Sequence, residues 1–203
     1  MLIGNEGDTL RLIKTVLFSA LIFHVLCTGS PPVARSQEPI NNTRLWVFKS
    51  QRELWLIKGG KVKKVYHISL GRNSKGPKLR KGDNRTPEGE YFISEKKINT
   101  PFHRFLALSY PNITDADQAL ERRLIAPKQW ADIWFALQIN QTPPANTPLG
   151  GRIGIHGQGA LDHQTQRILD DIDWTKGCIA ITNAEIEELY RLILLGTPVK
   201  IWR

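Results

Sequence analysis

Short apolar runs separated by polar turns fill the first half of the chain, and this pattern predicts β-strands. Residues 45–48 and 54–57 are aromatic and branched, with a polar turn between them. Gly59-Gly60 then favours a tight hairpin that leads into a strand over residues 61–70. Because that strand alternates only in part, we expect it to contain a bulge or to lie at an edge. Further strands are predicted at residues 89–93, 105–109, 152–156 and 199–202.

Apolar residues three and four positions apart appear later in the chain and predict helices. Residues 115–124 are one candidate, and residues 127–139 are a better one because a proline opens them. Their tryptophans, Trp130 and Trp134, are expected to anchor a core and not to form a ligand platform. A last helix over residues 184–195 starts at a Thr182 capping box and stops at Gly196. The pattern predicts a mainly β protein with a few helices.

The N-terminus has the three parts of an export signal. Arg11 and Lys14 precede an apolar run over residues 16–27, and residues 34–36 form a small-x-small cleavage site. A helix of that run would be about 18 Å long, which is short of the ~30 Å hydrocarbon core. We therefore expect a signal peptide over residues 1–36 and one domain over residues 37–203. An uncleaved anchor is the alternative, and lipid attachment at Cys27 is disfavoured because the preceding residue, Leu26, is not small.

Positive charge narrows the range of partners. The formal net charge is +9, and residues 1–36 contribute little of it. This favours cell-wall polymer, a phospholipid surface or nucleic acid. Export and the absence of a zinc-finger or RNP-type motif argue against nucleic acid, whereas peripheral membrane contact stays open. The basic residues are densest at 58–64 and 72–81, where a solvated hairpin and loop competes with a surface for carboxylate-rich wall peptides.

Cys178 is the only thiol that the predicted mature chain keeps. An unpaired cysteine in an exported protein suggests a nucleophile, which needs a nearby base to become reactive. His156 ends a short apolar run before a glycine, while His163 lies closer to the cysteine in sequence, and spacing alone does not decide between them. His67 and His103 are expected to be structural.

Other features add little chemistry. Helix propensity is poor over residues 177–181, so the thiol is expected at the start of a strand, and a backbone N–H beside it could face an oxyanion. Asp170, Asp171 and Asp173 near His163 are expected in a solvated turn. No spacing of ligands predicts a metal site, and no cofactor is expected.

Two segments, Ile155-His156-Gly157 and Thr175-Lys176-Gly177-Cys178-Ile179, follow a pattern of His-Gly and then Ser/Thr-x-Gly-Cys. In this pattern the chain resembles the L,D-transpeptidase (YkuD-like) catalytic domains of bacterial cell-wall enzymes. Lys81-Gly82-Asp83, Thr86-Pro87-Glu88-Gly89 and the run over residues 147–151 also match. The resemblance spans residues 45–202.

This resemblance implies an L,D-transpeptidase-like β-sandwich or barrel in a periplasmic or wall-associated bacterial enzyme. It favours His156 over His163 as the general base and acid for Cys178. The substrate would be a peptidoglycan stem peptide, attacked at a carbonyl beside a meso-diaminopimelate-type residue. The roles implied for other residues are oxyanion binding near Gly177, support from Thr175, and substrate contacts by Gly157 and Trp174. Arg152 is a candidate on other grounds: it stands two residues before His156, would share its face in a regular strand, and could from there reach a substrate carboxylate.

One departure bears on the reaction. Family members that cross-link often carry arginine two residues after the cysteine, where this chain has Ala180. The version from Trp174 to Asn183 resembles a subgroup associated with hydrolysis at peptidoglycan–protein links. Hydrolysis is therefore slightly favoured over transpeptidation, and a wall-linked protein becomes a candidate partner. A non-catalytic peptidoglycan-binding module of the same fold is the alternative from a different class.

Overall fold

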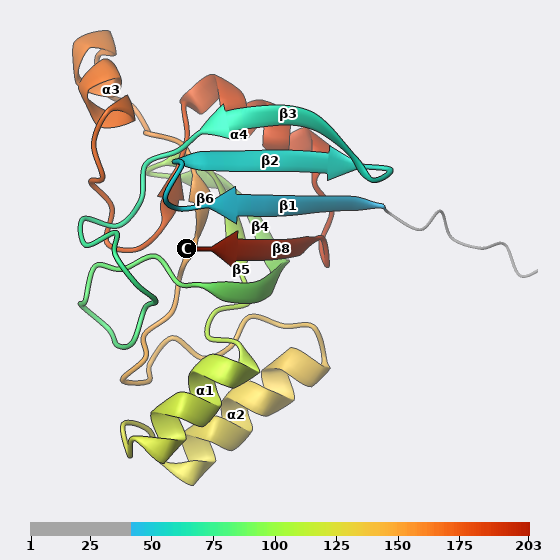
Figure 1. Ribbon diagram of the computed structural model, residues 1–203, viewed down its shortest axis with the longest axis vertical. Helices are drawn as coiled ribbons and strands as arrows, with labels where there is room; N and C mark the ends of the chain where they lie inside the picture. Colours follow the sequence, from blue (N-terminus) through green and yellow to red (C-terminus); the bar gives the residue numbers. More distant parts are fainter. Residues whose placement is uncertain (1–41) are drawn as a thin grey trace, which may run out of the picture. The chain divides into compact units, whose positions relative to one another are not determined.

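One curled, eight-stranded sheet dominates the computed structural model, which describes residues 42–203 (Figure 1). The strand order is β3-β2-β1-β8-β4-β5-β6-β7. The strands are β1 (Thr43–Phe48), β2 (Glu53–Lys58), β3 (Lys61–His67), β4 (Gly89–Thr100), β5 (His103–Leu108), β6 (Gly154–His156), β7 (Ile179–Ala180) and β8 (Pro198–Trp202). The helices are α1 (Ile113–Glu121), α2 (Pro127–Gln138), α3 (His163–Asp170) and α4 (Asn183–Leu192). The prediction of a mainly β fold is confirmed, and the predicted signal peptide lies outside the described residues.

The predicted hairpin between β2 and β3 forms as expected. Gly59 and Gly60 both have positive φ angles, +61° and +75°, which suit a tight turn between twisted strands. β3 lies at the sheet edge, and its pairing with β2 shifts register between Leu56 and Ile57. Partial alternation therefore did mark an edge strand with an irregular register.

Alternating burial along the strands forms the main core. Leu45 and Val47 of β1 point inward, and α4 adds Ile186 and Leu189 to the same cluster. The capping box of α4 is present, since Thr182 Oγ1 accepts from the Glu185 N–H. Because this helix packs beside β5 and β6, it holds the end of the sheet that carries the chemistry-bearing residues.

A second, smaller cluster joins α1 and α2. Ile133 is fully buried there, and Leu149 packs with it. Trp134 is 43% exposed, so the expectation that it anchors a core is wrong. The reason is that α2 packs mainly against α1, which buries one narrow stripe and leaves the neighbouring positions in water. Trp130 is half-buried, and its indole N–H donates to Asp117.

Residues 163–170 form α3, which Asp162 caps although none of the helical residues is buried. Two further expectations need correction. Asp173 does not lie in a solvated turn, because it pairs with Arg52 and accepts from the Leu70 N–H at 2.9 Å. The last helix ends at Leu192 and not at Gly196, which leaves Leu194 exposed.

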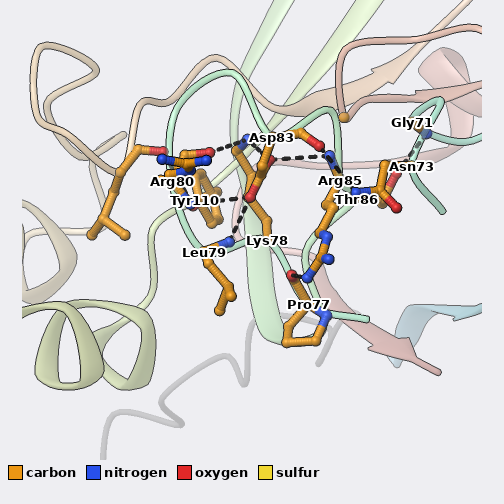
Figure 2. A network of polar contacts seen from close by, with 12 residues as sticks. Gly71, Asn73, Pro77, Lys78, Leu79, Arg80, Asp83, Arg85, Thr86 and Tyr110 are labelled. Carbon is orange, nitrogen blue, oxygen red and sulfur yellow. Dashed lines mark hydrogen bonds and ion pairs between the residues drawn. The ribbon is translucent and has the colours of Figure 1, made fainter. Parts of the chain in front are cut away.

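The basic loop after β3 is organised around one carboxylate (Figure 2). Asp83 accepts from the backbone N–H groups of Leu79, Arg80 and Arg85, at 2.7, 3.0 and 3.1 Å. The ammonium of Lys78 lies 2.7 Å from the same carboxylate and is buried. Burial alone would raise the pKa of Asp83, but these hydrogen bonds outweigh it and hold that pKa below its usual range. The expectation of a solvated loop is therefore wrong for Lys78.

Backbone contacts also pack this loop against the turn that contains Cys178. The Gly71 N–H donates to Thr86 Oγ1 at 3.0 Å (Figure 2). A Cβ at Gly71 would lie 2.2 Å from the Asn84 carbonyl oxygen and 3.0 Å from the Gly177 Cα. Only a residue without a side chain fits this approach, so the loop over residues 71–86 lies directly against the turn.

Asp83→Asn is expected to lower the free energy of unfolding by about 3 kcal/mol, because it leaves the buried Lys78 ammonium without its counter-ion. The matched control is Asp132→Asn, which removes an exposed pair with Lys128 and should cost at most about 0.5 kcal/mol. Urea unfolding of the three proteins measures the difference.

The same carboxylate should make stability pH-dependent. Because folding lowers the pKa of Asp83, its stabilising contribution is present above the unfolded value of about 3.9 and is lost as the pH falls through the lower folded value. If Asp83→Asn and Asp132→Asn lowered the free energy of unfolding equally at pH 7, a buried ion pair between Lys78 and Asp83 would be contradicted.

Candidate functional site

The parallel pairing of β6 with β7 brings the predicted nucleophile and base to one place. Ile155 is in register with Ile179, and His156 with Ala180. Cys178 directly precedes β7, at the strand start where the sequence predicted it. Because alternate residues of a strand share a face, Cys178 lies on the face of His156 and one step along the diagonal from it. Diagonal neighbours in a sheet are within reach of long or aromatic side chains.

His156 lies in an aromatic cage. Its residue is 2% exposed, and its ring centroid lies 4.4 Å from that of Phe102, 6.0 Å from Phe105 and 5.7 Å from Trp174. Phe105 is the in-register partner of His156 on β5 and stacks parallel to the imidazole. Neither phenylalanine was predicted as a site residue, and the available signal was the aromatic segment that flanks His103.

A carbonyl group selects the tautomer of the imidazole. The Nδ1 of His156 lies 2.6 Å from the carbonyl oxygen of Gly157. A carbonyl only accepts hydrogen bonds, so Nδ1 carries the proton and Nε2 of the neutral ring has a free lone pair. Burial lowers the pKa of His156 to about 4, and the hydrogen bond to Gly157 only partly opposes this. The ring is therefore neutral at pH 7 and can accept a proton at Nε2.

The Cys178 thiol is also neutral at pH 7. The residue is half-buried, and its Sγ lies 3.5 Å from the carbonyl oxygen of Arg152. Burial raises the pKa of Cys178 to about 11, while a hydrogen bond with the Gly154 backbone and the charge of Lys78 act in the opposite direction. The site thus holds a neutral thiol and a neutral imidazole, in place of a preformed ion pair.

Thr175 and Gly177 shape the turn that presents the thiol. The Gly177 N–H donates to Thr175 Oγ1 at 3.0 Å, and this hydroxyl donates to the Cys178 carbonyl oxygen at 2.7 Å. Gly177 has a φ of +127°, and a Cβ there would lie 2.6 Å from the Arg85 carbonyl oxygen. The Gly177 N–H is therefore already engaged. Within residues 42–203 the Cys178 N–H has no hydrogen-bond partner, which leaves it as the amide beside the thiol for an incoming oxygen.

Gly157 and Trp174 support the imidazole. Gly157 is buried, and a Cβ there would lie 2.6 Å from the Asn183 Oδ1 and 2.9 Å from the Phe102 carbonyl oxygen. Its glycine is thus required by internal packing, and its carbonyl orients His156. Trp174 contacts the imidazole edge-on. Substrate contacts by these two residues stay predictions.

Arg152 does not share a regular strand with His156, contrary to expectation. It lies before β6 with a φ of +57°, in the left-handed region that non-glycine residues seldom adopt. Its exposed side chain lines a groove of about 450 Å³ next to the Cys178 turn. A substrate contact by Arg152 stays a prediction, now from the groove and not from the face of a strand.

Asn183 holds the segment that follows the histidine and was not predicted as a site residue. Its Oδ1 accepts from the N–H groups of Gln158 and Gly159, and its Nδ2 donates to the Gly159 carbonyl. Gln158 in turn donates to the Asp170 carboxylate at 2.7 Å, which ties α3 to this segment. Apart from its place in the motif that follows Cys178, the sequence carries no signal for this role.

The other histidines lie outside the cage. His67 contacts the Asp170 carbonyl and His103 pairs with Glu187 on α4, which fits the structural roles expected for both. His163 is exposed at the start of α3.

The part of the chain that the structure describes contains no group of three or more His, Cys, Asp or Glu residues able to hold a metal ion. No helix in that part is long and apolar enough to cross a membrane.

Several solved structures are similar to this one at low sequence identity. The helical cell shape determining protein Pgp2 of Campylobacter jejuni, in a mutant form, is 21% identical with a TM-score of 0.51, over 79% of this chain and 47% of that one. Bd1075 of Bdellovibrio bacteriovorus is 22% identical with a TM-score of 0.48, over 80% and 48%. A mutant L,D-transpeptidase of Enterococcus faecium is 14% identical with a TM-score of 0.46, over 79% and 50%.

The chain thus spans about half the length of these three proteins. No curated protein matches it. The family model of the L,D-transpeptidase catalytic domain (YkuD) matches residues 42–201, which include the whole site described above. The chain therefore belongs to the L,D-transpeptidase catalytic domain family.

Proposed function

We propose that this protein is an exported cysteine acyl-transfer enzyme that acts on peptidoglycan stem peptides at a carbonyl beside a meso-diaminopimelate-type residue. The observation that carries the proposal is the Gly157 carbonyl on His156 Nδ1, which leaves Nε2 free to accept a proton on the sheet face of Cys178. Membership of the family supports the substrate class.

In the first step the Cys178 sulfur attacks the carbonyl carbon while His156 Nε2 takes the thiol proton. Because both groups are neutral at pH 7, proton transfer accompanies the attack. The carbonyl oxygen gains negative charge and accepts from the Cys178 N–H. When the tetrahedral intermediate collapses, the C–N bond breaks and the imidazolium returns its proton to the leaving amine.

In the second step water or an amine attacks the thioester, again with His156 as the base, and the thiol leaves with a proton. Hydrolysis is favoured over transfer because Ala180 offers no guanidinium to bind an acceptor carboxylate. A link between the wall and a protein is then one candidate for the bond that is cut.

Trp174 supports a substrate contact beside His156. Its buried indole N–H has no hydrogen-bond partner within the described residues. Buried indole N–H groups normally find an acceptor. A carbonyl of a bound stem peptide would satisfy it beside His156, whose ring Trp174 contacts.

A non-catalytic wall-binding module is the rival function. The observation that favours it is the pKa of Cys178, which burial raises to about 11, so that little thiolate exists at neutral pH. The rival predicts wall binding without turnover.

Cys178→Ala should abolish turnover of defined tetrapeptide muropeptides, with or without a protein-linked stem, and leave binding to purified wall intact. His156→Gln should lower kcat/KM by about 10²–10⁴, the usual contribution of a general base. His163→Gln is the matched control and should behave as the unmodified enzyme. Mass spectrometry of the products measures all three. Turnover that survives Cys178→Ala would remove the enzyme proposal.

Thiol labelling tests the neutral state of the pair. Below its pKa a thiol gains about tenfold in thiolate for each pH unit, so the rate of alkylation by iodoacetamide should climb about a hundredfold from pH 7 to pH 9. The unfolded protein should instead level off near the ordinary pKa of about 8.5. Mass spectrometry of the peptide that contains Cys178 gives the rate. A native rate that is already flat at pH 7 would show a preformed thiolate.

A further inference from the structure

A cationic groove lies beside the Cys178 turn. It measures about 450 Å³ and is lined by Lys81, Ala145, Asn146, Gly150, Gly151 and Arg152. Arg152 connects it to the nucleophile, because the Arg152 carbonyl oxygen lies 3.5 Å from the Cys178 Sγ. A ligand group in the groove is therefore close to the bond that the thiol would attack.

The two cations of the groove have no counter-ions among residues 42–203. Lys81 and Arg152 are exposed, and neither side chain makes an ion pair or hydrogen bond to a described residue. Other cations of the protein differ, since Lys78 pairs with Asp83 and Arg52 with Asp173. No acidic residue lines the groove. A concave surface with two unpaired positive charges attracts an anion.

Local backbone structure keeps the groove in place. Arg152 has a φ of +57°, and strained residues of this kind cluster at functional sites. The Lys81 N–H donates to the Pro148 carbonyl at 2.8 Å, which joins two loops that are distant in sequence. A Cβ on Gly150 would lie 3.2 Å from the Lys81 Cβ, and one on Gly151 would lie 2.7 Å from the Ala145 Cβ. The glycines allow the loops to pack closely and leave the space beside the cations open.

We infer that Lys81 and Arg152 form a subsite that binds a free carboxylate of the substrate peptide next to the scissile carbonyl. This inference rests on the proposed function for its choice of ligand. A guanidinium can hold a carboxylate through two parallel hydrogen bonds, and the lysine adds a point charge. A stem peptide offers two such groups near the reacting bond, the terminal carboxylate and the side-chain carboxylate of the diaminopimelate-type residue. The subsite selects peptides in which the bound carboxylate is not amidated.

Binding to Cys178→Ala protein tests the subsite without turnover. The probes are a tetrapeptide with both carboxylates free and two versions amidated at one carboxylate each, measured by isothermal titration calorimetry. Amidation of the bound carboxylate should weaken binding at least about tenfold, the effect of losing a charge-assisted hydrogen bond. Arg152→Met should weaken binding of the free peptide to a similar extent and abolish the difference between the probes.

Lys81→Met should have a smaller effect in the same direction, and Lys63→Met, an exposed lysine of β3, is the matched control with no effect. Discrimination that survives both groove variants overturns the inference, as does Cys178→Ala protein that binds none of the probes. Inorganic phosphate that displaces the peptide far better than acetate would assign the groove to phosphate and also overturn it.

Turnover by the unmodified enzyme separates this inference from the proposed function. Equal kcat/KM for free and amidated peptides would leave the enzyme proposal standing and remove the carboxylate subsite. If binding distinguishes the free from the amidated peptides but no probe is turned over, the carboxylate subsite stands and the enzyme proposal falls.

Discussion

The pairing of two very short strands is the constraint on which the site depends. β6 has three residues and β7 has two, yet their register places Cys178 on the same face of the sheet as His156. Neighbouring contacts hold so short a ladder together. Ile155 and Ile179 are fully buried beneath it, and Ser69 exchanges two backbone hydrogen bonds with Ala180 on its far side. The placement of Cys178 relative to His156 therefore depends on the core and on the neighbouring strand, and not on the two side chains themselves.

Burial sets the protonation states of His156 and Cys178 and keeps both groups neutral. The aromatic cage around His156 disfavours the imidazolium, and the surroundings of Cys178 disfavour the thiolate. In the proposed mechanism, charge appears only while the substrate reacts, when the Cys178 N–H can donate to the oxygen that becomes negative. An arrangement of this kind limits side reactions of the thiol, because its nucleophilic form is scarce until a carbonyl and a base are both in place.

Features encoded over a few neighbouring residues could be predicted from the sequence. The Gly59-Gly60 turn and the Thr182 cap depend on local geometry, and both form as expected. Features that depend on partners distant in sequence could not be predicted in this way. The exposure of Trp134 follows from what packs against α2, and the burial of Lys78 follows from the loop that Asp83 organises. The left-handed backbone of Arg152 removes it from the expected strand, and its contact with the Cys178 sulfur through its carbonyl oxygen was not predicted.

The segment that connects β6 to β7 contains one helix, α3, which packs no residue into the core, unlike the strands that the segment joins. Gln158 donates to the Gln166 carbonyl and the Asp170 carboxylate of α3, and the Ser69 hydroxyl donates to its Leu169 carbonyl. Parallel strands require a long connection, but nothing in their pairing prescribes its contents. α3 can consequently be exchanged or lengthened, provided that the residues next to His156 and Cys178 in the crossover are kept. It offers a position at which grafted loops could alter access to Cys178 without changing the pairing of β6 with β7.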